Sequence, residues 1–145
     1  MVNKICYLFF SLVLIANIIS CVPEFGKTVI SQPDEYTYVY EGKETVILRA
    51  IANVFKEKNI GSNVTIDYNN LRVNSDYLYS GDWRTKANAR VKKISWKECE
   101  VTLAVTTDKK TVTGWEMRRL LQKEQYYNFF SYIDLKIYEE MSKVE

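Results

Sequence analysis

The chain has 145 residues, of which 47% are hydrophobic and 26% charged, with only five Gly and two Pro. This length suits one domain, and the composition excludes a disordered or collagen-like protein. A formal net charge of +2 gives no global basic field for nucleic-acid binding, and the absence of histidine removes the commonest general base and metal ligand.

The first 20 residues have the pattern of a signal peptide. Lys4 is followed by 15 uncharged and mostly apolar residues, 5–19. A membrane-spanning helix needs about 20 apolar residues, so this run is short for a permanent anchor but typical of a signal sequence. We therefore expect residues 1–20 to be absent from the mature protein.

The apolar run ends in Ile18-Ile19-Ser20-Cys21, which resembles the lipobox of bacterial lipoproteins. This resemblance implies cleavage after Ser20, diacylglycerol on the Cys21 sulfur and usually a further acyl chain, such as palmitate, on the new amino group. Two or more acyl chains hold a protein stably on a bilayer. Because Val22 is not Asp, the resemblance implies a lipid-anchored protein of the cell envelope, sorted to the outer rather than the inner membrane.

A secreted soluble protein is the alternative interpretation of the same N-terminus. In that case Cys21 forms a disulfide with Cys99, and Asn63-Val64-Thr65 is a glycan acceptor. In the lipoprotein interpretation Cys6 leaves with the signal peptide, and Cys99 remains alone as a small buried hydrophobic residue in a predicted strand. The two interpretations therefore differ in the state of the Cys21 thiol.

The mature chain predicts a tether followed by one domain. Residues 21–34 contain both prolines and little periodicity, so we expect them to link the membrane to a domain over 35–145. Residues 35–41 are rich in Tyr, Thr and Val, which predicts a strand. Residues 44–58 have apolar positions spaced for one helix face. Alternation over 64–68 predicts a second strand.

The middle of the chain predicts a long hairpin. Residues 71–79 show no clear period, and 80–82 predict a turn. Alternation over 83–96 predicts a half-buried strand, with a bulge near its end where the apolar phase moves to Ile94 and Trp96. A turn and a partner strand then follow over 97–110.

The C-terminal residues predict a long helix. Thr113 and Glu116 have the spacing of a capping box. The helix is expected from Trp115 to Met141, which contains no Gly or Pro. A shift in its apolar phase leaves open whether it is continuous or breaks near Asn128 or Ser131.

The predicted fold class is α+β, with the order β-α-β-β-β-α. An antiparallel sheet of about four strands buries one face against two helices. This topology is similar to small helix-grip-like domains found in several bacterial envelope lipoproteins. The similarity implies a fold but does not fix a function.

A row of basic side chains lies on one face of the predicted strand 83–96 and consists of Arg84, Lys86, Arg90 and Lys92. Neighbours in such a row are about 6.6 Å apart. The row is a candidate site for an anionic polysaccharide, lipid headgroups or an acidic protein. The favoured alternative is cross-strand neutralisation by Glu98 and Glu100.

An aromatic cluster on the predicted helix is the second candidate surface and contains Tyr126, Tyr127, Phe129, Phe130 and Tyr132. One buried stripe cannot hide all of these side chains. Either an aromatic patch is exposed as a partner surface, or the cluster packs on the sheet against Tyr36, Tyr38 or Tyr40.

The predicted function is non-catalytic. Without histidine, Ser and Cys lack their usual activating base, and the carboxylates that might act in pairs show no defined spacing: Asp67, Asp76, Asp82, Glu98 and Glu100. No metal, cofactor or nucleic acid is expected. We expect an envelope lipoprotein that binds another envelope protein or an anionic surface ligand, and a small cell-wall enzyme using acidic residues is the other alternative.

Overall fold

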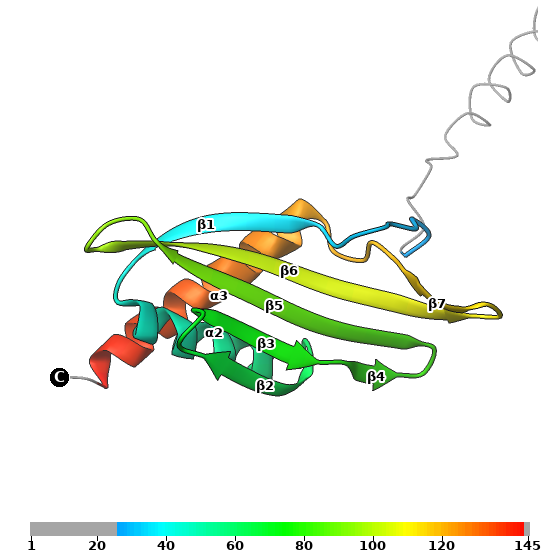
Figure 1. Ribbon diagram of the computed structural model, residues 1–145, viewed down its shortest axis with the longest axis horizontal. Helices are drawn as coiled ribbons and strands as arrows, with labels where there is room; N and C mark the ends of the chain where they lie inside the picture. Colours follow the sequence, from blue (N-terminus) through cyan, green and yellow to red (C-terminus); the bar gives the residue numbers. More distant parts are fainter. Residues whose placement is uncertain (1–25, 144–145) are drawn as a thin grey trace, which may run out of the picture.

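The computed structural model describes residues 26–143 and has an α+β fold (Figure 1). One antiparallel sheet is curved around two helices, which lie on the same face of the sheet. The predicted fold class is confirmed, although the sheet has seven strands instead of about four. The predicted signal peptide and Cys21 lie outside the described residues.

The elements follow the chain in the order β1 (Glu35–Glu41), α2 (Glu44–Glu57), β2 (Ser62–Asp67), β3 (Arg72–Asp76), β4 (Leu78–Ser80), β5 (Trp83–Lys93), β6 (Glu98–Thr111), β7 (Gly114–Met117) and α3 (Lys123–Ser142). The spatial order of the main sheet is β1-β6-β5-β3-β2. The short strands β4 and β7 extend one end of the sheet, where β4 pairs with β5 and β7 pairs with β6.

The core lies between the sheet and the helices. Helix α2 buries its apolar stripe completely, including Ile47, Ile51 and Phe55, as its spacing predicts. Alternate residues of β5 and β6 face this stripe, so Ala89 and Leu103 are buried as well. The two helices also contact each other through Glu140, whose carboxylate accepts hydrogen bonds from Arg49 and Asn53.

The β5–β6 hairpin is more regular than predicted, and its first strand ends at Lys93 instead of Trp96. Its pairing runs without a shift from Trp83 opposite Lys109 to Lys93 opposite Cys99, so the predicted bulge is absent from this pairing. Ile94 and Trp96 are instead exposed in the connecting loop, outside the strand. Their apolar character does not reflect burial against the core.

The ambiguous segment 71–79 forms β3 and β4, two of the additional strands. A tight turn precedes β3, in which the Asp67 carboxylate accepts hydrogen bonds from the backbone N–H groups of Asn69 and Asn70. Only Val73 and Ser75 of β3 are buried. A strand with so little apolar side-chain area carries a weak period-two signal.

The predicted capping box at Thr113 and Glu116 is wrong. Residues 114–117 form β7, which pairs with β6, and Gly114 adopts a φ of 130° in the hairpin turn. A cap contributes about 1 kcal/mol, less than a paired strand that continues the sheet. Helix α3 begins at Lys123 after a different capping box, between Gln122 and Gln125.

Helix α3 is continuous. Neither Asn128 nor Ser131 interrupts it, and the Ser131 hydroxyl donates to the Tyr127 carbonyl one turn earlier. Neither α2 nor α3, within the described part of the chain, is long and apolar enough to cross a membrane. The helix that the sequence places over 115–141 is thus a short strand, a connector and a twenty-residue helix.

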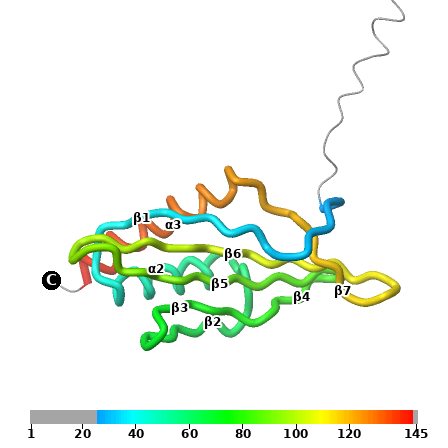
Figure 2. Tube along the Cα trace, turned by 45° about the horizontal axis from the view of Figure 1, so that its top comes forward, coloured from blue at the N-terminus to red at the C-terminus, as the bar shows by residue number. Residues whose placement is uncertain are grey.

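The segment before β1 lies along the connector between β7 and α3 (Figure 2). The backbone N–H of Ile30 donates to the Met117 carbonyl, and that of Arg119 donates to the Thr28 carbonyl. The Arg119 side chain binds both carboxylate oxygens of Asp34, at 2.6 and 3.0 Å. Hydrogen bonds and an ion pair therefore attach residues 26–34 to one end of the domain.

Candidate functional site

The sheet face opposite the helices, which we call the open face, carries the predicted basic row. Ala87, Ala89 and Val91 point to the core, so Arg84, Lys86, Arg90 and Lys92 project from the other side of β5. Cross-strand pairing then determines which side chains surround each basic residue.

Arg84 is a structural residue of the open face. Its Nε donates to the Asp108 carboxylate at 2.8 Å, and Asp108 is only 4% exposed. The guanidinium carbon lies 4.1 Å from the ring centroid of Tyr77 and 4.5 Å from that of Trp115. The Arg84 guanidinium group is therefore in contact with two aromatic rings and a buried carboxylate, and its charge is neutralised within the fold.

The other three basic residues differ in their surroundings. Lys86 lies over the Tyr77 ring, with its Nζ 4.7 Å from the centroid. Lys92 is directly opposite Glu100, as the neutralisation hypothesis expects. Arg90, however, is bound by Glu35 of β1, at 3.0 Å.

Glu98 does not neutralise the row. It lies opposite Glu41 of β1, and its carboxylate is 3.3 Å from the Ser95 hydroxyl in the hairpin loop. The basic row is therefore partly neutralised, by Asp108 and Glu100 within the hairpin and by Glu35 of β1 outside it.

Strand β3 adds residues that no pattern in the sequence marks as a site. Arg72 is the direct cross-strand partner of Arg90, and Asn74 is the direct partner of Asn88. These four side chains line a hollow of about 390 Å³, whose lining also includes Glu35 of β1 and the small residues Thr102 and Ala104 of β6. We call this feature the sheet hollow. Two guanidinium groups, two amides and the Glu35 carboxylate thus line one polar depression.

The charges of the sheet hollow are only loosely compensated. The Arg90–Glu35 pair is 53% exposed on both sides, and such surface pairs contribute about 0–1 kcal/mol. Arg72 lies near Asp67, whose pKa is lowered mainly by hydrogen bonds from Asn70 and to a smaller extent by the Arg72 charge. Like charges directly opposite each other on adjacent strands are unfavourable. An oxyanion between the two guanidinium groups would relieve this repulsion.

The aromatic cluster divides between core and surface. Tyr126 and Phe130 are buried, which corrects their assignment to a partner surface. Tyr126 lies against Tyr36, with centroids 4.4 Å apart, and Phe130 stacks on Tyr38 at 5.6 Å. The packing of these two residues on β1 therefore follows the alternative interpretation.

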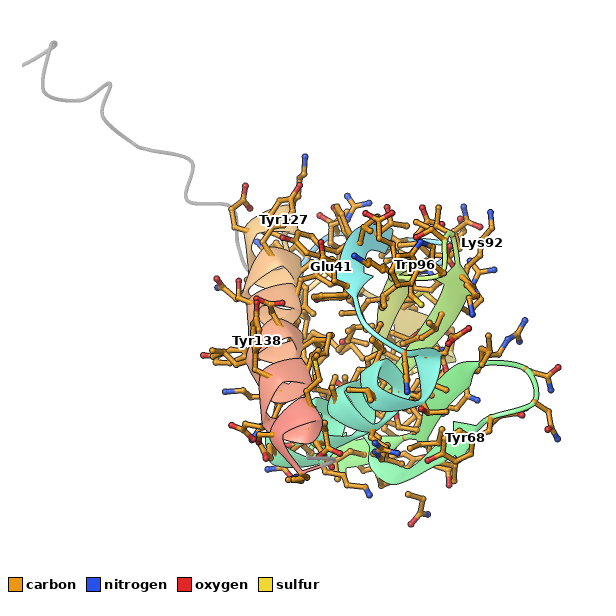
Figure 3. All side chains as sticks on the ribbon, turned by 90° about the vertical axis from the view of Figure 1, so that its left-hand side faces the viewer. Glu41, Tyr68, Lys92, Trp96, Tyr127 and Tyr138 are labelled. Atoms are coloured by element: carbon orange, nitrogen blue, oxygen red, sulfur yellow. The ribbon has the colours of Figure 1, made fainter. Side chains whose placement is uncertain are left out.

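The exposed remainder of the cluster is a shallow groove between β1 and α3. Tyr127 is 46% exposed and lines this groove of about 340 Å³ together with Tyr38 and Leu135 (Figure 3). Phe129 is partly buried against the core. The aromatic surface is thus smaller than the sequence suggests, and it includes residues of β1.

The buried hydroxyls of Tyr126 in the cluster and of Tyr40 on β1 are structural as well. The Tyr126 hydroxyl accepts from the Val105 N–H and donates to the Asp34 carbonyl. Burial raises the pKa of Tyr126 to about 12, so this hydroxyl stays protonated at neutral pH. The Tyr40 hydroxyl donates to the Phe130 carbonyl at 2.7 Å, and burial raises its pKa further.

Acidic residues and Cys99 complete the inventory. The Asp67 and Asp76 carboxylates accept hydrogen bonds from the side-chain amides of Asn70 and Asn63, respectively. No group of three or more His, Cys, Asp or Glu within the described residues is arranged to hold a metal ion. Cys99 is 1% exposed, and burial raises the pKa of its thiol.

Comparisons with known proteins do not assign a function. No known family model matches the chain, and no curated protein matches it significantly. The sheet hollow, the β1–α3 groove and the sequence pattern at Cys21 therefore carry the functional argument.

Proposed function

We propose that the protein is a bacterial envelope lipoprotein, anchored by acyl chains on Cys21, that acts as a non-catalytic binding module. Its ligand is an oxyanion carried on a hydroxyl-rich molecule, such as a carboxylated or phosphorylated surface glycan. The observation that carries the proposal is the sheet hollow, where Arg72 faces Arg90 and Asn74 faces Asn88.

The chemistry of the sheet hollow suits such a ligand. Guanidinium groups bind carboxylates and phosphates through paired N–H donors. Amide side chains both donate and accept hydrogen bonds, as hydroxyl groups require. The hollow is on a sheet, so its four side chains are positioned by strand register instead of by a loop.

The geometry also bears on the alternative disulfide. A Cβ at Gly26 would lie 2.9 Å from the Trp83 ring, so Gly26 is at the same end of the sheet as Lys109, the partner of Trp83. Cys99 is ten residues back along β6, or about 33 Å. The five residues from Cys21 to Gly26 span at most about 18 Å, and a disulfide requires Cα atoms within about 7 Å. Pairing Cys21 with Cys99 would therefore detach residues 26–34 from the domain.

Metabolic labelling with a fatty acid tests the anchor. We expect label on the protein in bacterial cells and loss of that label in Cys21→Ser. A Cys99→Ser variant is the matched control, because it removes the other thiol of the mature chain and should keep the label. Label that survives in Cys21→Ser would contradict the proposed anchor.

Retention on an immobilised polyuronate, compared with neutral dextran, tests the binding site. The Arg72→Gln/Arg90→Gln variant is expected to lose retention, since both anchoring guanidinium groups are removed. The control, Lys56→Gln/Lys123→Gln, removes the same charge from exposed positions on the two helices. Equal loss in both variants would indicate a nonspecific charge effect, and unchanged retention in the first would refute the site.

A further inference from the structure

The β6–β7 hairpin projects from the end of the sheet at which β4 and β7 lie (Figure 1). Its tip, residues 111–114, presents Val112 as a fully exposed hydrophobic side chain. The Thr111 and Thr113 hydroxyls are 3.1 Å apart, and the Thr111 hydroxyl also donates to the Gly114 carbonyl. The turn is therefore ordered by its own hydrogen bonds while its apolar residue points into solvent.

Aromatic residues surround the base of this hairpin. Trp83 lies below the ammonium group of Lys109, with its ring centroid 5.4 Å from the Nζ. Tyr79 is well exposed and contacts Trp115 edge-on at 5.9 Å. Trp and Tyr are the residues that proteins place at the headgroup level of a bilayer, since one part of each ring is apolar and another polar.

The charge at this end is positive. Lys27, Lys109 and Lys110 are exposed there. The facing acids are Asp82, which is exposed, Glu116, which is paired with Arg118, and Asp108, which is paired with Arg84. Among the described residues, the exposed Lys109 and Lys110 therefore lie at the same end as a single acid, Asp82, that is not paired with an arginine.

The start of the described chain lies at the same end. Gly26 is against Trp83 and Leu120, Ile30 is hydrogen-bonded to Met117 at the end of β7, and Thr28 is hydrogen-bonded to Arg119 in the connector that follows. Because Cys21 is five residues before Gly26, an acylated Cys21 lies within about 18 Å of it. An acyl anchor at Cys21 would therefore hold the bilayer near the β6–β7 tip and away from the Trp96 loop, which is at the other end of β5 and β6.

From these four observations we infer that the β6–β7 tip is a second membrane contact, which binds the surface of an anionic bilayer. Val112 enters the interface, and Lys109 and Lys110 meet lipid phosphates. This contact rests on the proposed acylation of Cys21, which supplies the attachment but leaves the domain free to rotate. Together, two contacts at one end fix the long axis of the sheet relative to the membrane and hold the Trp96 loop away from it.

Site-specific fluorescence tests the contact in the acylated protein. The protein is purified from cells, placed in vesicles of phosphatidylglycerol and phosphatidylethanolamine, and labelled with a thiol-reactive NBD dye at Val112→Cys. Trp96→Cys is the matched control, because Trp96 is 81% exposed in the hairpin loop at the opposite end. Native Cys99 is buried and does not compete for the dye.

We expect NBD at position 112 to shift to the blue and to be quenched by spin-labelled lipid, and NBD at position 96 to do neither. The NBD signal at position 112 also gives the ratio of membrane-bound to unbound tip. Replacing Lys109 and Lys110 by Gln is expected to lower this ratio about fivefold per lysine. The control variant, Lys56→Gln, should leave this ratio unchanged.

The outcomes that overturn the inference are distinct. If vesicles float with the protein but position 112 behaves like position 96, the anchor stands and the tip contact is refuted. A blue shift without quenching by lipid would show that protein covers the tip, which also refutes the contact. If the protein does not float with the vesicles, the acyl anchor itself fails, and the inference fails with it.

Discussion

Replacing Arg84 by Ser separates a structural residue from a binding residue within the same basic row. The substitution removes the ion-pair partner of the Asp108 carboxylate, which is only 4% exposed. It also removes the contacts of the guanidinium group with Tyr77 and Trp115. We therefore expect Arg84→Ser to lower the free energy of unfolding of the whole domain, instead of weakening ligand binding alone.

The magnitude follows from these contacts. A hydrogen bond to a charged group contributes about 1.5–3 kcal/mol, and each cation–π contact about 0.5–1 kcal/mol. Since the Arg84 side chain is 21% exposed, the lower half of the combined range applies, and we expect a loss of about 3 kcal/mol. Arg90→Ser is the matched control and should cost no more than about 1 kcal/mol, because its ion pair with Glu35 is half exposed.

Urea denaturation of the mature protein, followed by tryptophan fluorescence, measures both variants. The prediction is a clearly lower unfolding midpoint for Arg84→Ser and a nearly unchanged midpoint for Arg90→Ser. If both variants unfold at the wild-type midpoint, the Arg84–Asp108 pair does not stabilise the fold. Arg84 would then again be a candidate ligand-binding residue of the basic row.

Three further predictions concern the core, the pH dependence and the free thiol. Phe55→Ala, at a fully buried position of α2, is expected to cost about 3–5 kcal/mol, and a smaller loss in urea denaturation would contradict the close packing of this core. The pKa of Glu140 is lowered from its ordinary value of 4.5, mainly by the hydrogen bond from Lys143. Its contribution is therefore present above this value and lost as the pH falls through the folded pKa, so Glu140→Gln should flatten the fall of the urea midpoint below about pH 4.5. Cys99 should react with a thiol reagent only after denaturation, and fast reaction in the native state would show that its burial is not maintained.

Where local and tertiary signals agree, the sequence predicts the elements closely. Strand β1 has the predicted bounds, and α2 ends one residue before the predicted limit. In both elements the residues with high intrinsic propensity are also spaced to bury one face. The hairpin of β5 and β6 follows the same rule, because its alternation matches the pairing in register.

The C-terminal third shows where such prediction fails. The Thr113–Glu116 spacing is a genuine local cap signal, but Gly114 and the pairing of 114–117 with β6 determine the structure. The pairing of one strand with another depends on the tertiary fold and cannot be predicted from the local pattern of a single sequence. Strand β3 has only a weak alternation signal, since most of its side chains are polar.

The candidate site was predictable only in part for the same reason. The alternation of β5 placed its basic residues on one face, which is confirmed. The sheet hollow, however, depends on β3 lying beside β5 with Arg72 opposite Arg90. The neutralisation of Arg84 depends on Asp108, 24 residues away, and on the Tyr77 and Trp115 rings.

The mass of the N-terminal peptide of the protein isolated from bacterial envelopes tests the account most directly. Lipoprotein processing at Cys21 predicts that Cys21 is the first residue and carries a mass increment equal to diacylglycerol plus, usually, one acyl chain. An unmodified Cys21, or a Cys21 joined by a disulfide to Cys99, would contradict it and leave the sheet hollow without an acyl anchor at the membrane.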